Sequence, residues 1–361
     1  MAIFKAGAKY SGKAVVGPSK SHVIRLLFCA MLSGIKTTVF FRGTLCDDIL
    51  AMISAVSDVG ASVCYDEEKI IVSRTGALNK TATVNLKECG TGFAFFSVLN
   101  CFPGWNLTLK RERSLLSRDF SGAKVDFDAN GNVIVSGEKS SQPVSAAIIC
   151  AALEGHQKRE VFVRGKICSR GYIEMTSQVV KLFEKNDEIS VFAEADGSSL
   201  SVLEAASYLG AEIDFEKDNV SLQPDATCSK YFDKDVVDIT DNPDLIFTLS
   251  VIAASHMGRT VIKNVLRLKN KESDRANGCV KFINALGGNA ELIGNNVEVT
   301  GNGKLLGGSV CAEGDHRVAF AAFLASLISE NDVSCVGAEE AVKKSWPDFI
   351  ETIRGLEASN A

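Results

Sequence analysis

Short polar clusters stand directly before several apolar helical segments, and their residue types suggest a common chemistry. A Ser, Asn or Asp there normally acts as an N-cap, whose side chain accepts a hydrogen bond from a free backbone N–H group. Cations are less expected, since Lys20 and Arg317 oppose the positive end of the helix dipole by about 0.3–1 kcal/mol. An anion bound by the backbone N–H groups and these cations would remove the conflict. Capping alone explains any one cluster, whereas the set favours a shared anionic ligand: Ser19-Lys20-Ser21, Gly90-Thr91, Ser140-Ser141-Gln142, Asp241-Asn242-Pro243-Asp244, Asp315-His316-Arg317 and Lys344-Ser345-Trp346-Pro347-Asp348.

A further charged cluster covers residues 271–275. Ser273 is the expected helix cap in it, which places Arg275 near the first helical turn. A solvated run of surface charge is the plain alternative. The cluster occupies the same place in its repeat as Asp47-Asp48 in the first repeat, and this position favours a cleft.

A recurring unit organises the elements that must position these clusters. One copy covers residues 19–73 and another residues 244–301, each in the order helix, glycine stop, strand, charged turn, helix and strand hairpin. Apolar residues recur near every 3.6 positions in the helices, and the strands are β-branched or alternating. Gly34 and Gly258 stand where helix C-caps belong. Partial copies extend the pattern, so we expect an α/β fold of stacked supersecondary units with antiparallel hairpins.

Length and composition limit the class of protein. A chain of 361 residues exceeds one ordinary core, so two domains are expected. The formal net charge of −5 disfavours binding to nucleic acids or anionic membranes, which needs a basic surface. The 11 cysteines include no C-x-x-C pair, so buried reduced thiols are expected instead of a zinc or redox site. Neither a signal peptide nor a spanning segment is visible, and we expect a cytoplasmic protein.

Several motifs, taken in order, resemble the 5-enolpyruvylshikimate-3-phosphate synthase family. They are PSKS at 18–21 with Arg25, SSQ at 140–142, NPD at 242–244, KESDR at 271–275, DHR at 315–317 and KSWPDF at 344–349. The resemblance implies a two-domain inside-out α/β barrel of repeated βαβαββ units, with one unit shortened. Residues 1–15 and 215–361 would form the first domain and residues 16–214 the second, with the active site in the cleft between them.

The resemblance also implies a reaction. The enolpyruvyl group of phosphoenolpyruvate (PEP) would be transferred to the 5-hydroxyl of shikimate 3-phosphate, with release of phosphate, in the shikimate pathway to chorismate and aromatic amino acids. No metal or organic cofactor is expected, because acid–base work and electrostatic preorganisation can carry this chemistry. The two substrates are the expected partners, without nucleic acid or membrane, and a monomer is expected.

Matching positions imply a role for each site residue. PEP would be held by Lys20, Arg118, Arg275, Arg317 and Lys344, with Gly90 allowing close backbone approach. The shikimate phosphate would be held by Ser140, Ser141, Ser169 and Lys271, and the ring hydroxyls and carboxylate by Ser21, Arg25, Gln142, Tyr172 and Asp244. Asp244 is the candidate base at the 5-hydroxyl. Glu272, together with Lys20, is the candidate for proton transfer at PEP.

One segment departs from the family pattern N-A-G-T-A-x-R. Glu88 replaces Asn and Ala94 replaces Arg, which adds an anion and removes a cation beside the expected PEP pocket. Asp119, next to Arg118, stands where Pro is usual. The stretch after Tyr172 and the region 119–137 are also short. We therefore expect weaker PEP binding than is usual in the family.

Two other functions fit part of the pattern. A catalytically impaired, anion-binding relative would account for the altered segment 88–94 and for the shortening. The sister enolpyruvyl transferase that acts on UDP-N-acetylglucosamine commonly uses a reactive loop cysteine, and no cysteine here stands in a clearly cationic loop. The SSQ and KESDR segments favour the shikimate branch.

Overall fold

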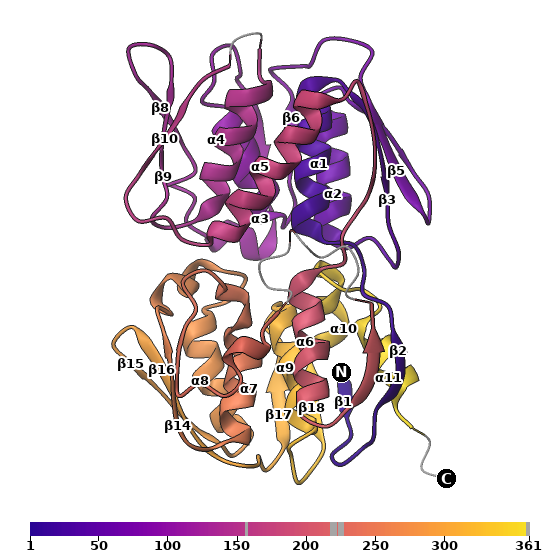
Figure 1. The fold of residues 1–361 in the computed structure, drawn as a ribbon, viewed down its shortest axis with the longest axis vertical. Coiled ribbons are helices and arrows are strands. Elements are labelled where there is room, and N and C mark those ends of the chain that lie inside the picture. The colour runs from indigo at the N-terminus through magenta and orange to yellow at the C-terminus, as the bar shows by residue number, and fades with distance from the viewer. Residues whose placement is uncertain (156–157, 217–221, 223–226, 359–361) are drawn as a thin grey trace. The chain divides into compact units, whose positions relative to one another are not determined.

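A computed structural model describes residues 1–155, 158–216, 222 and 227–358. Contacts divide the chain into two compact units, both of mixed α/β structure (Figure 1). The internal unit contains Pro18–Glu194. The terminal unit contains residues 1–17 and the described residues from Ala195 onward, apart from Leu222.

Helices fill the centre of the internal unit. They are α1 (Lys20–Ser33), α2 (Asp47–Asp58), α3 (Gly90–Leu99), α4 (Ser141–Leu153) and α5 (Arg170–Lys185), with the short 3-10 helix η1 (Arg113–Ser117). Helix α1 contacts the other four and is buried from His22 to Leu32, as expected for a helix that is apolar on all sides. Gly34 ends α1 with φ 77° and donates its backbone N–H to the carbonyl oxygen of Ala30, so the expected cap is confirmed.

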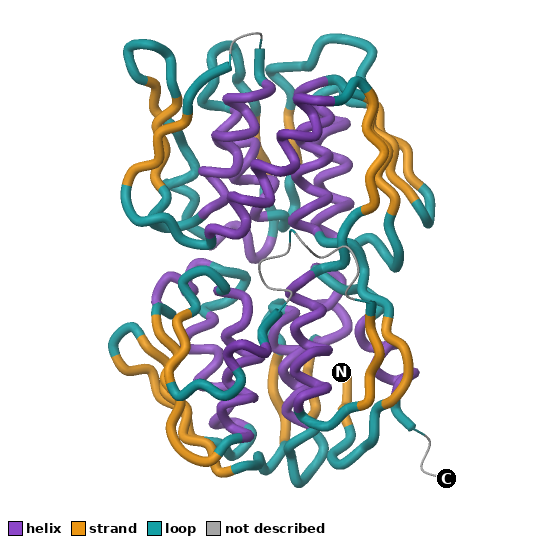
Figure 2. Tube along the Cα trace, in the orientation of Figure 1, coloured by secondary structure: helices purple, strands orange, loops and turns teal. Residues whose placement is uncertain are grey.

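Three small sheets surround these helices (Figure 2). In the largest, β3 (Lys36–Phe40) pairs parallel with β11 (Glu188–Phe192) and antiparallel with β5 (Lys69–Ser73), which also pairs with β4 (Ser62–Tyr65). The second contains β8 (Asp126–Phe127), β9 (Val133–Ser136) and β10 (Val161–Arg164). The third pairs β6 (Thr83–Asn85) with β7 (Thr108–Lys110) in parallel.

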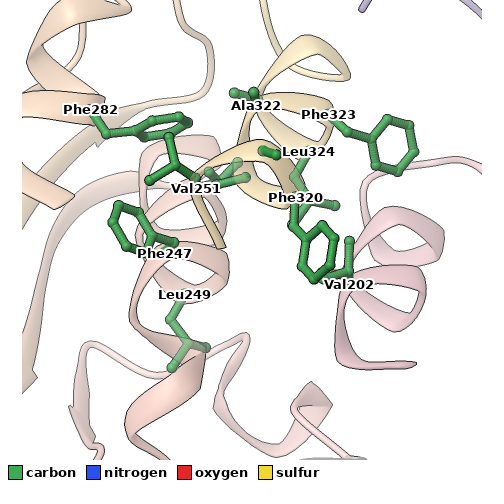
Figure 3. Packing of buried hydrophobic residues seen from close by; sticks show 14 of the residues in the cluster. Val202, Phe247, Leu249, Val251, Phe282, Phe320, Ala322, Phe323 and Leu324 are labelled. Carbon is green, nitrogen blue, oxygen red and sulfur yellow. The ribbon is translucent and has the colours of Figure 1, made fainter. Parts of the chain in front are cut away.

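Helices also fill the centre of the terminal unit. They are α6 (Gly197–Tyr208), α7 (Ile246–Ser255), α8 (Arg275–Ala285), α9 (His316–Ser326), α10 (Ala338–Ala341) and α11 (Phe349–Leu356), with the 3-10 helices η2 (Ser229–Tyr231), η3 (Pro243–Leu245), η4 (Leu266–Asn270) and η5 (Val342–Lys344). The hydrophobic core lies among them (Figure 3). Phe247 of α7 and Phe282 of α8 form a T-shaped pair, and Phe320 and Phe323 of α9 are buried in the same cluster.

Three sheets complete the terminal unit. One has the order β13 (Val236–Asp238), β14 (Met257–Lys263), β16 (Asn296–Asn302) and β15 (Asn289–Ile293). Another has the order β1 (Ala2–Phe4), β18 (Val333–Val336) and β17 (Gly308–Cys311). In the third, β2 (Ser11–Ala14) pairs in parallel with β12 (Glu212–Phe215). Helices inside and short sheets outside are thus common to both units.

Two local details differ from the sequence analysis. Helix α7 ends at Ser255 with His256 as its C-cap, and Gly258 lies inside β14 with φ 106°, so the expected cap there is wrong. The strand begins directly after the helix and leaves no room for a separate glycine stop. Helix α8 is capped by Asp274, which accepts a hydrogen bond from Asn277 N at 3.2 Å, and not by Ser273.

The chain passes from the terminal to the internal unit at Gly17–Pro18 and returns at Glu194–Ala195. The sequence had instead predicted the second boundary near residue 214. The physical reason lies in the elements between these points. Helix α6 contacts α7 and α9 of the terminal unit, and β12 pairs with β2 of the same unit.

Candidate functional site

Side-chain contacts link the first turns of α1 to α5 in the internal unit. Lys20 of α1 pairs with Asp48 of α2, and Gln142 of α4 donates to Thr91 of α3 at 2.9 Å. Arg25 of α1 reaches the carbonyl oxygen of Tyr172 in α5 at 3.2 Å. The positive ends of five helix dipoles therefore gather at one end of this unit, where free backbone N–H groups favour an anion.

Lys20 occupies the first position of α1, and Ser19 caps this helix by accepting from His22 N at 3.2 Å. The Lys20 ammonium lies 3.2 Å from the Asp48 carboxylate, and only 14% and 5% of these two side chains are exposed. Asp48 thus offsets part of the unfavourable charge at the helix start. This partner of Lys20 was not predictable from the sequence, because residues 20 and 48 are far apart in the chain.

Arg25 is a buried cation with neutral partners. Its Nε donates to Thr176 Oγ1 at 2.7 Å, Nη1 donates to the carbonyl oxygen of Ser21 at 2.7 Å, and Nη2 donates to Ser145 Oγ at 3.2 Å. Burial lowers the pKa of Arg25 to about 10. A positive charge compensated only by dipoles attracts an anion, since a carboxylate would offset the cost of desolvation. The predicted ligands Ser21, Arg25 and Tyr172 thus lie together.

The start of α3 adjoins Arg118. Cys89 caps this helix through Sγ, which accepts from Gly92 N at 3.3 Å, and Gly90 is the first helical residue. A Cβ atom at Gly90 would lie 2.6 Å from Arg118 Nη1. The missing side chain therefore allows the guanidinium to lie directly against the first turn of the helix.

The two altered positions of this segment differ in their surroundings. The Glu88 carboxylate accepts hydrogen bonds from Ser114 N at 3.1 Å and Ser114 Oγ at 2.6 Å, and Arg113 lies 3.7 Å away. Glu88 therefore anchors the loop that carries Arg118, and its charge is partly neutralised there. Ala94 is buried, with 1% of its surface exposed.

The predicted serine ligands stand at two further helix starts. Ser140 caps α4 by accepting from Gln142 N at 3.2 Å, and Ser141 is the first residue of that helix. Ser169 is the N-cap residue of α5, in the left-handed region with φ 53°. Helices α4 and α5 contact each other, so the three serines belong to neighbouring elements.

Arg275 is the centre of the site residues in the terminal unit. With 1% of its side chain exposed, it donates to Asp315 at 2.7 Å, to Glu272 at 2.6 Å and to Asp244. Asp315 also caps α9 and accepts from Ser273 Oγ at 2.9 Å. These bonds join the starts of α7, α8 and α9. The three carboxylates accept four hydrogen bonds from Arg275, so an anionic ligand would compete with them for this guanidinium.

Asp244 lies among three cations. Its carboxylate contacts Arg275, lies 3.5 Å from Lys271 Nζ and lies 3.6 Å from Arg317 Nη2. Burial by itself raises the pKa of Asp244, but Lys271, Arg275 and Arg317 together outweigh it and hold this pKa well below its usual value. Burial in turn lowers the pKa of Lys271. Asp244 is consequently ionised at neutral pH.

Arg317 has a partner that the sequence analysis missed. Its Nη2 donates to Ser198 Oγ at 2.6 Å and its Nη1 donates to the carbonyl oxygen of Ser198 at 3.1 Å. Ser198 Oγ in turn donates to Asp196, the N-cap of α6. The polar start of α6, D-G-S-S, was the available signal, because it resembles the other helix starts.

Lys344 ends η5, which contacts α9, and is buried with 7% of its surface exposed. Across the described part of the chain, no group of three or more His, Cys, Asp or Glu side chains is placed to hold a metal ion. No helix in the described ranges has the length and apolar composition needed to cross a lipid bilayer. All 11 cysteines lie in the described ranges, where none of them forms a disulfide, and nine are fully or partly buried.

Known proteins resemble this chain over nearly its whole length. The 3-phosphoshikimate 1-carboxyvinyltransferase of Clostridium perfringens (strain SM101) is 24% identical, over 97% of this chain and 96% of that protein. The protein of the same name from Methanocorpusculum labreanum is 26% identical, over 99% of each chain. The one from Clostridioides difficile is 26% identical, over 97% of this chain and 96% of that protein.

The fold and a family model agree with these relatives. An EPSP synthase structure from Acinetobacter baumannii matches the fold with a TM-score of 0.76 at 16% identity, over 99% of this chain and 98% of that chain. Residues 190–353 match the family model described as EPSP synthase (3-phosphoshikimate 1-carboxyvinyltransferase). Over nearly its whole length the chain is thus similar to proteins named 3-phosphoshikimate 1-carboxyvinyltransferase, and it shares the fold of an EPSP synthase.

Proposed function

We propose that this protein transfers the enolpyruvyl group of PEP to the 5-hydroxyl of shikimate 3-phosphate and releases phosphate. The observation that carries the proposal is the gathering of buried and partly buried cations at helix starts in each unit. Phosphate and carboxylate groups suit such sites, because backbone N–H groups and cations bind them together. The names of the full-length relatives support these two substrates. The cations are Lys20, Arg25 and Arg118 in the internal unit, and Lys271, Arg275 and Arg317 in the terminal unit.

The surroundings of the cations support a division of ligands. Arg25 and the serines at the helix starts, Ser140, Ser141 and Ser169, suit the carboxylate, hydroxyl and phosphate groups of shikimate 3-phosphate, which need many directional hydrogen bonds. Lys20 and Arg118 suit the compact, highly charged PEP, with Arg317 and Lys344 as its proposed partners from the terminal unit.

Asp244 is the proposed base at the 5-hydroxyl. The three cations keep it ionised without substrate, so it is ready to accept the proton as the hydroxyl oxygen bonds to C2 of PEP. When substrate anions engage Lys271 and Arg317, their hold on Asp244 weakens. Its pKa then rises and the carboxylate becomes a stronger base exactly where the substrate is bound.

Glu272, with Lys20, is the proposed proton donor to the methylene carbon of PEP. The resulting tetrahedral intermediate then loses phosphate, and removal of a proton from the new methyl group forms the vinyl ether. Glu272 accepts a hydrogen bond from Arg275 at 2.6 Å, so its position depends on the same guanidinium that contacts Asp244.

The proposal extends to the architecture. The helices inside and the sheets outside support inside-out α/β barrels built from repeated βαβαββ units (Figure 2). We propose one active site served by both units, a cytoplasmic monomer and no cofactor. The acid–base pair and the fixed cations supply the chemistry that this reaction needs.

Phosphate release in the presence of both substrates tests the proposal. The wild-type protein should release phosphate only when PEP and shikimate 3-phosphate are both present, and UDP-N-acetylglucosamine should not replace the latter. Glu272→Gln should lower kcat by about 10²-fold or more. Glu291→Gln, on the exposed side of β15, is the matched control and should behave like the wild type. Binding of both substrates without turnover would identify an impaired relative instead.

A further inference from the structure

A cluster of two guanidinium groups and two aromatic rings lies beside the start of α3. The Phe93 and Phe120 ring centroids are 4.7 Å apart. The Arg111 guanidinium carbon lies 5.3 Å from the Phe93 centroid and 5.9 Å from the Phe120 centroid. The Arg118 guanidinium carbon lies 5.3 Å from the Phe120 centroid. Arg111 thus lies within reach of a cation–π attraction to both rings, and Arg118 within reach of one to Phe120.

A hydrogen bond connects the two arginines more directly. Arg111 Nη1 donates to the backbone carbonyl oxygen of Arg118 at 3.2 Å. The backbone of Arg118 is therefore fixed by the side chain of Arg111, while its own guanidinium lies against Gly90. The loop is also held at Ser114 by Glu88, the residue that precedes the cap of α3.

The charge of Arg111 has no counter-ion among the side chains that the structure describes. In the described ranges no carboxylate forms an ion pair with Arg111, whose side chain is half-buried. Two like charges on one pair of rings beside the positive end of a helix are unfavourable without an anion. Phe93, which Arg111 covers, directly precedes Ala94 in α3, where a cation is missing. Arg111 therefore brings positive charge from the loop after β7 to a helix start that has none of its own.

We propose that Arg111 is a positioning residue for PEP, which orients Arg118 over the first turn of α3 and supplies the positive charge that Ala94 does not. The inference rests on the proposed function, since it names a further residue at the proposed PEP side. Weaker PEP binding, expected from the sequence at Glu88 and Ala94, is offset by Arg111.

The test compares three variants in steady-state kinetics. Arg111→Gln removes the charge and keeps a planar hydrogen-bonding group, so it should raise the KM for PEP about tenfold, leave the KM for shikimate 3-phosphate within about twofold and change kcat by less than about threefold. Arg111→Lys retains the charge and should recover a large part of the PEP affinity. Lys110→Gln removes the same charge from the exposed neighbouring position of β7 and should match the wild type.

Ionic strength supplies a readout that a purely structural role would not move. The difference in PEP KM between the wild type and Arg111→Gln should shrink as salt rises, because screening weakens the contribution of the charge. An unchanged KM for PEP in Arg111→Gln, or an equal rise in Lys110→Gln, would overturn the inference. Thermal unfolding of each variant shows whether the loop has lost its fold.

Calorimetric titration with PEP in the presence of shikimate 3-phosphate separates this inference from the proposed function. Should the wild type bind PEP without turnover and Arg111→Gln bind it about tenfold more weakly, the reaction is refuted and the role of Arg111 stands. If the wild type turns over both substrates and Arg111→Gln binds PEP as tightly as the wild type, the reaction stands and the role of Arg111 is refuted. No binding of PEP by the wild type would refute both.

Discussion

Arg275 shows how strongly a single residue can depend on its partners. Its guanidinium is buried and contacts Asp315, Glu272 and Asp244, so removing it takes a shared cation away from three acidic groups. Arg275→Met should therefore lower the free energy of unfolding by about 3–5 kcal/mol, as is typical when one partner of a buried ion pair is lost. Urea unfolding at pH 7 measures this change.

Arg259→Met is the control for Arg275→Met. Arg259 pairs with Glu298, but 61% of its side chain is exposed, so its loss should cost less than about 1 kcal/mol. Equal losses of stability in the two variants would contradict the central role of the buried network.

His22 offers a prediction about pH. Burial, followed by the charge of Arg25, lowers the pKa of His22 to about 4 from 6.5. The unfolded chain thus binds more protons between these values, so the stability contributed by neutral His22 is present above pH 6.5 and is lost as the pH falls toward 4. At about 1.4 kcal/mol per pKa unit, the loss approaches roughly 3 kcal/mol.

His22→Asn tests this dependence, because the asparagine oxygen can accept the hydrogen bond that His22 Nδ1 accepts from Glu194 N at 3.3 Å, without titrating. Between pH 7 and pH 4.5, the unfolding free energy of the wild type should fall more than that of the variant. Parallel curves would show that His22 does not titrate in this range.

At the scale of elements, the start of α6 positions Arg317 of α9. Ser198 accepts from the guanidinium through both its hydroxyl and its backbone oxygen. Ser198→Ala keeps the backbone contact and removes the other. The KM for PEP should rise about fivefold as Arg317 becomes less ordered, with a smaller change in kcat. Ser199→Ala is the matched control, since Ser199 Oγ bonds to the same Asp196 at 3.0 Å and not to Arg317. A similar effect of both substitutions would assign the role to the cap of α6 as a whole.

The helix starts were predictable from the sequence for a local reason. A cap such as Ser19, Ser140 or Asp315 bonds to backbone a few residues ahead, so its signal lies within one short window. Gly34 was predictable in the same way. The prediction of a helix cap at Gly258 was wrong, because a glycine shortly after a helix can also belong to a strand that follows the helix closely.

Partners from distant elements could not be predicted. The contacts Lys20–Asp48, Arg317–Ser198 and Glu88–Ser114 each join two segments whose neighbourhood depends on the packing of helices and loops. The charges around the helix starts are visible in the sequence, but which carboxylate neutralises which cation depends on the tertiary structure. Arg275 was expected as a ligand of PEP. For the same reason, the sequence could not predict that it is bonded to three protein carboxylates.

At the scale of the whole molecule, the joints between the units lie next to the site residues. Ser19 N donates to the carbonyl oxygen of Glu194 at 2.7 Å in the internal unit, and Asp196 N donates to the carbonyl oxygen of Gly17 at 3.0 Å in the terminal unit. Lys20 follows the first of these bonds directly, and Ser198 lies shortly after the second. A change of the backbone at these joints would thus shift the starts of α1 and α6, where the proposed ligands bind.

This arrangement leads to a prediction about shape. The proposed PEP ligands come from both units, Lys20 and Arg118 from one and Arg317 and Lys344 from the other. Bound anions should therefore draw the units together, because one anion would engage the proposed cations of both. Small-angle scattering should show a smaller radius of gyration when PEP and shikimate 3-phosphate are both present. The Arg317→Gln variant lacks one of the cations of the terminal unit, so its radius of gyration should decrease less at the same ligand concentrations. An unchanged radius in the wild type would mean that the ligands are held without closure, and each unit would then have to bind its own anion.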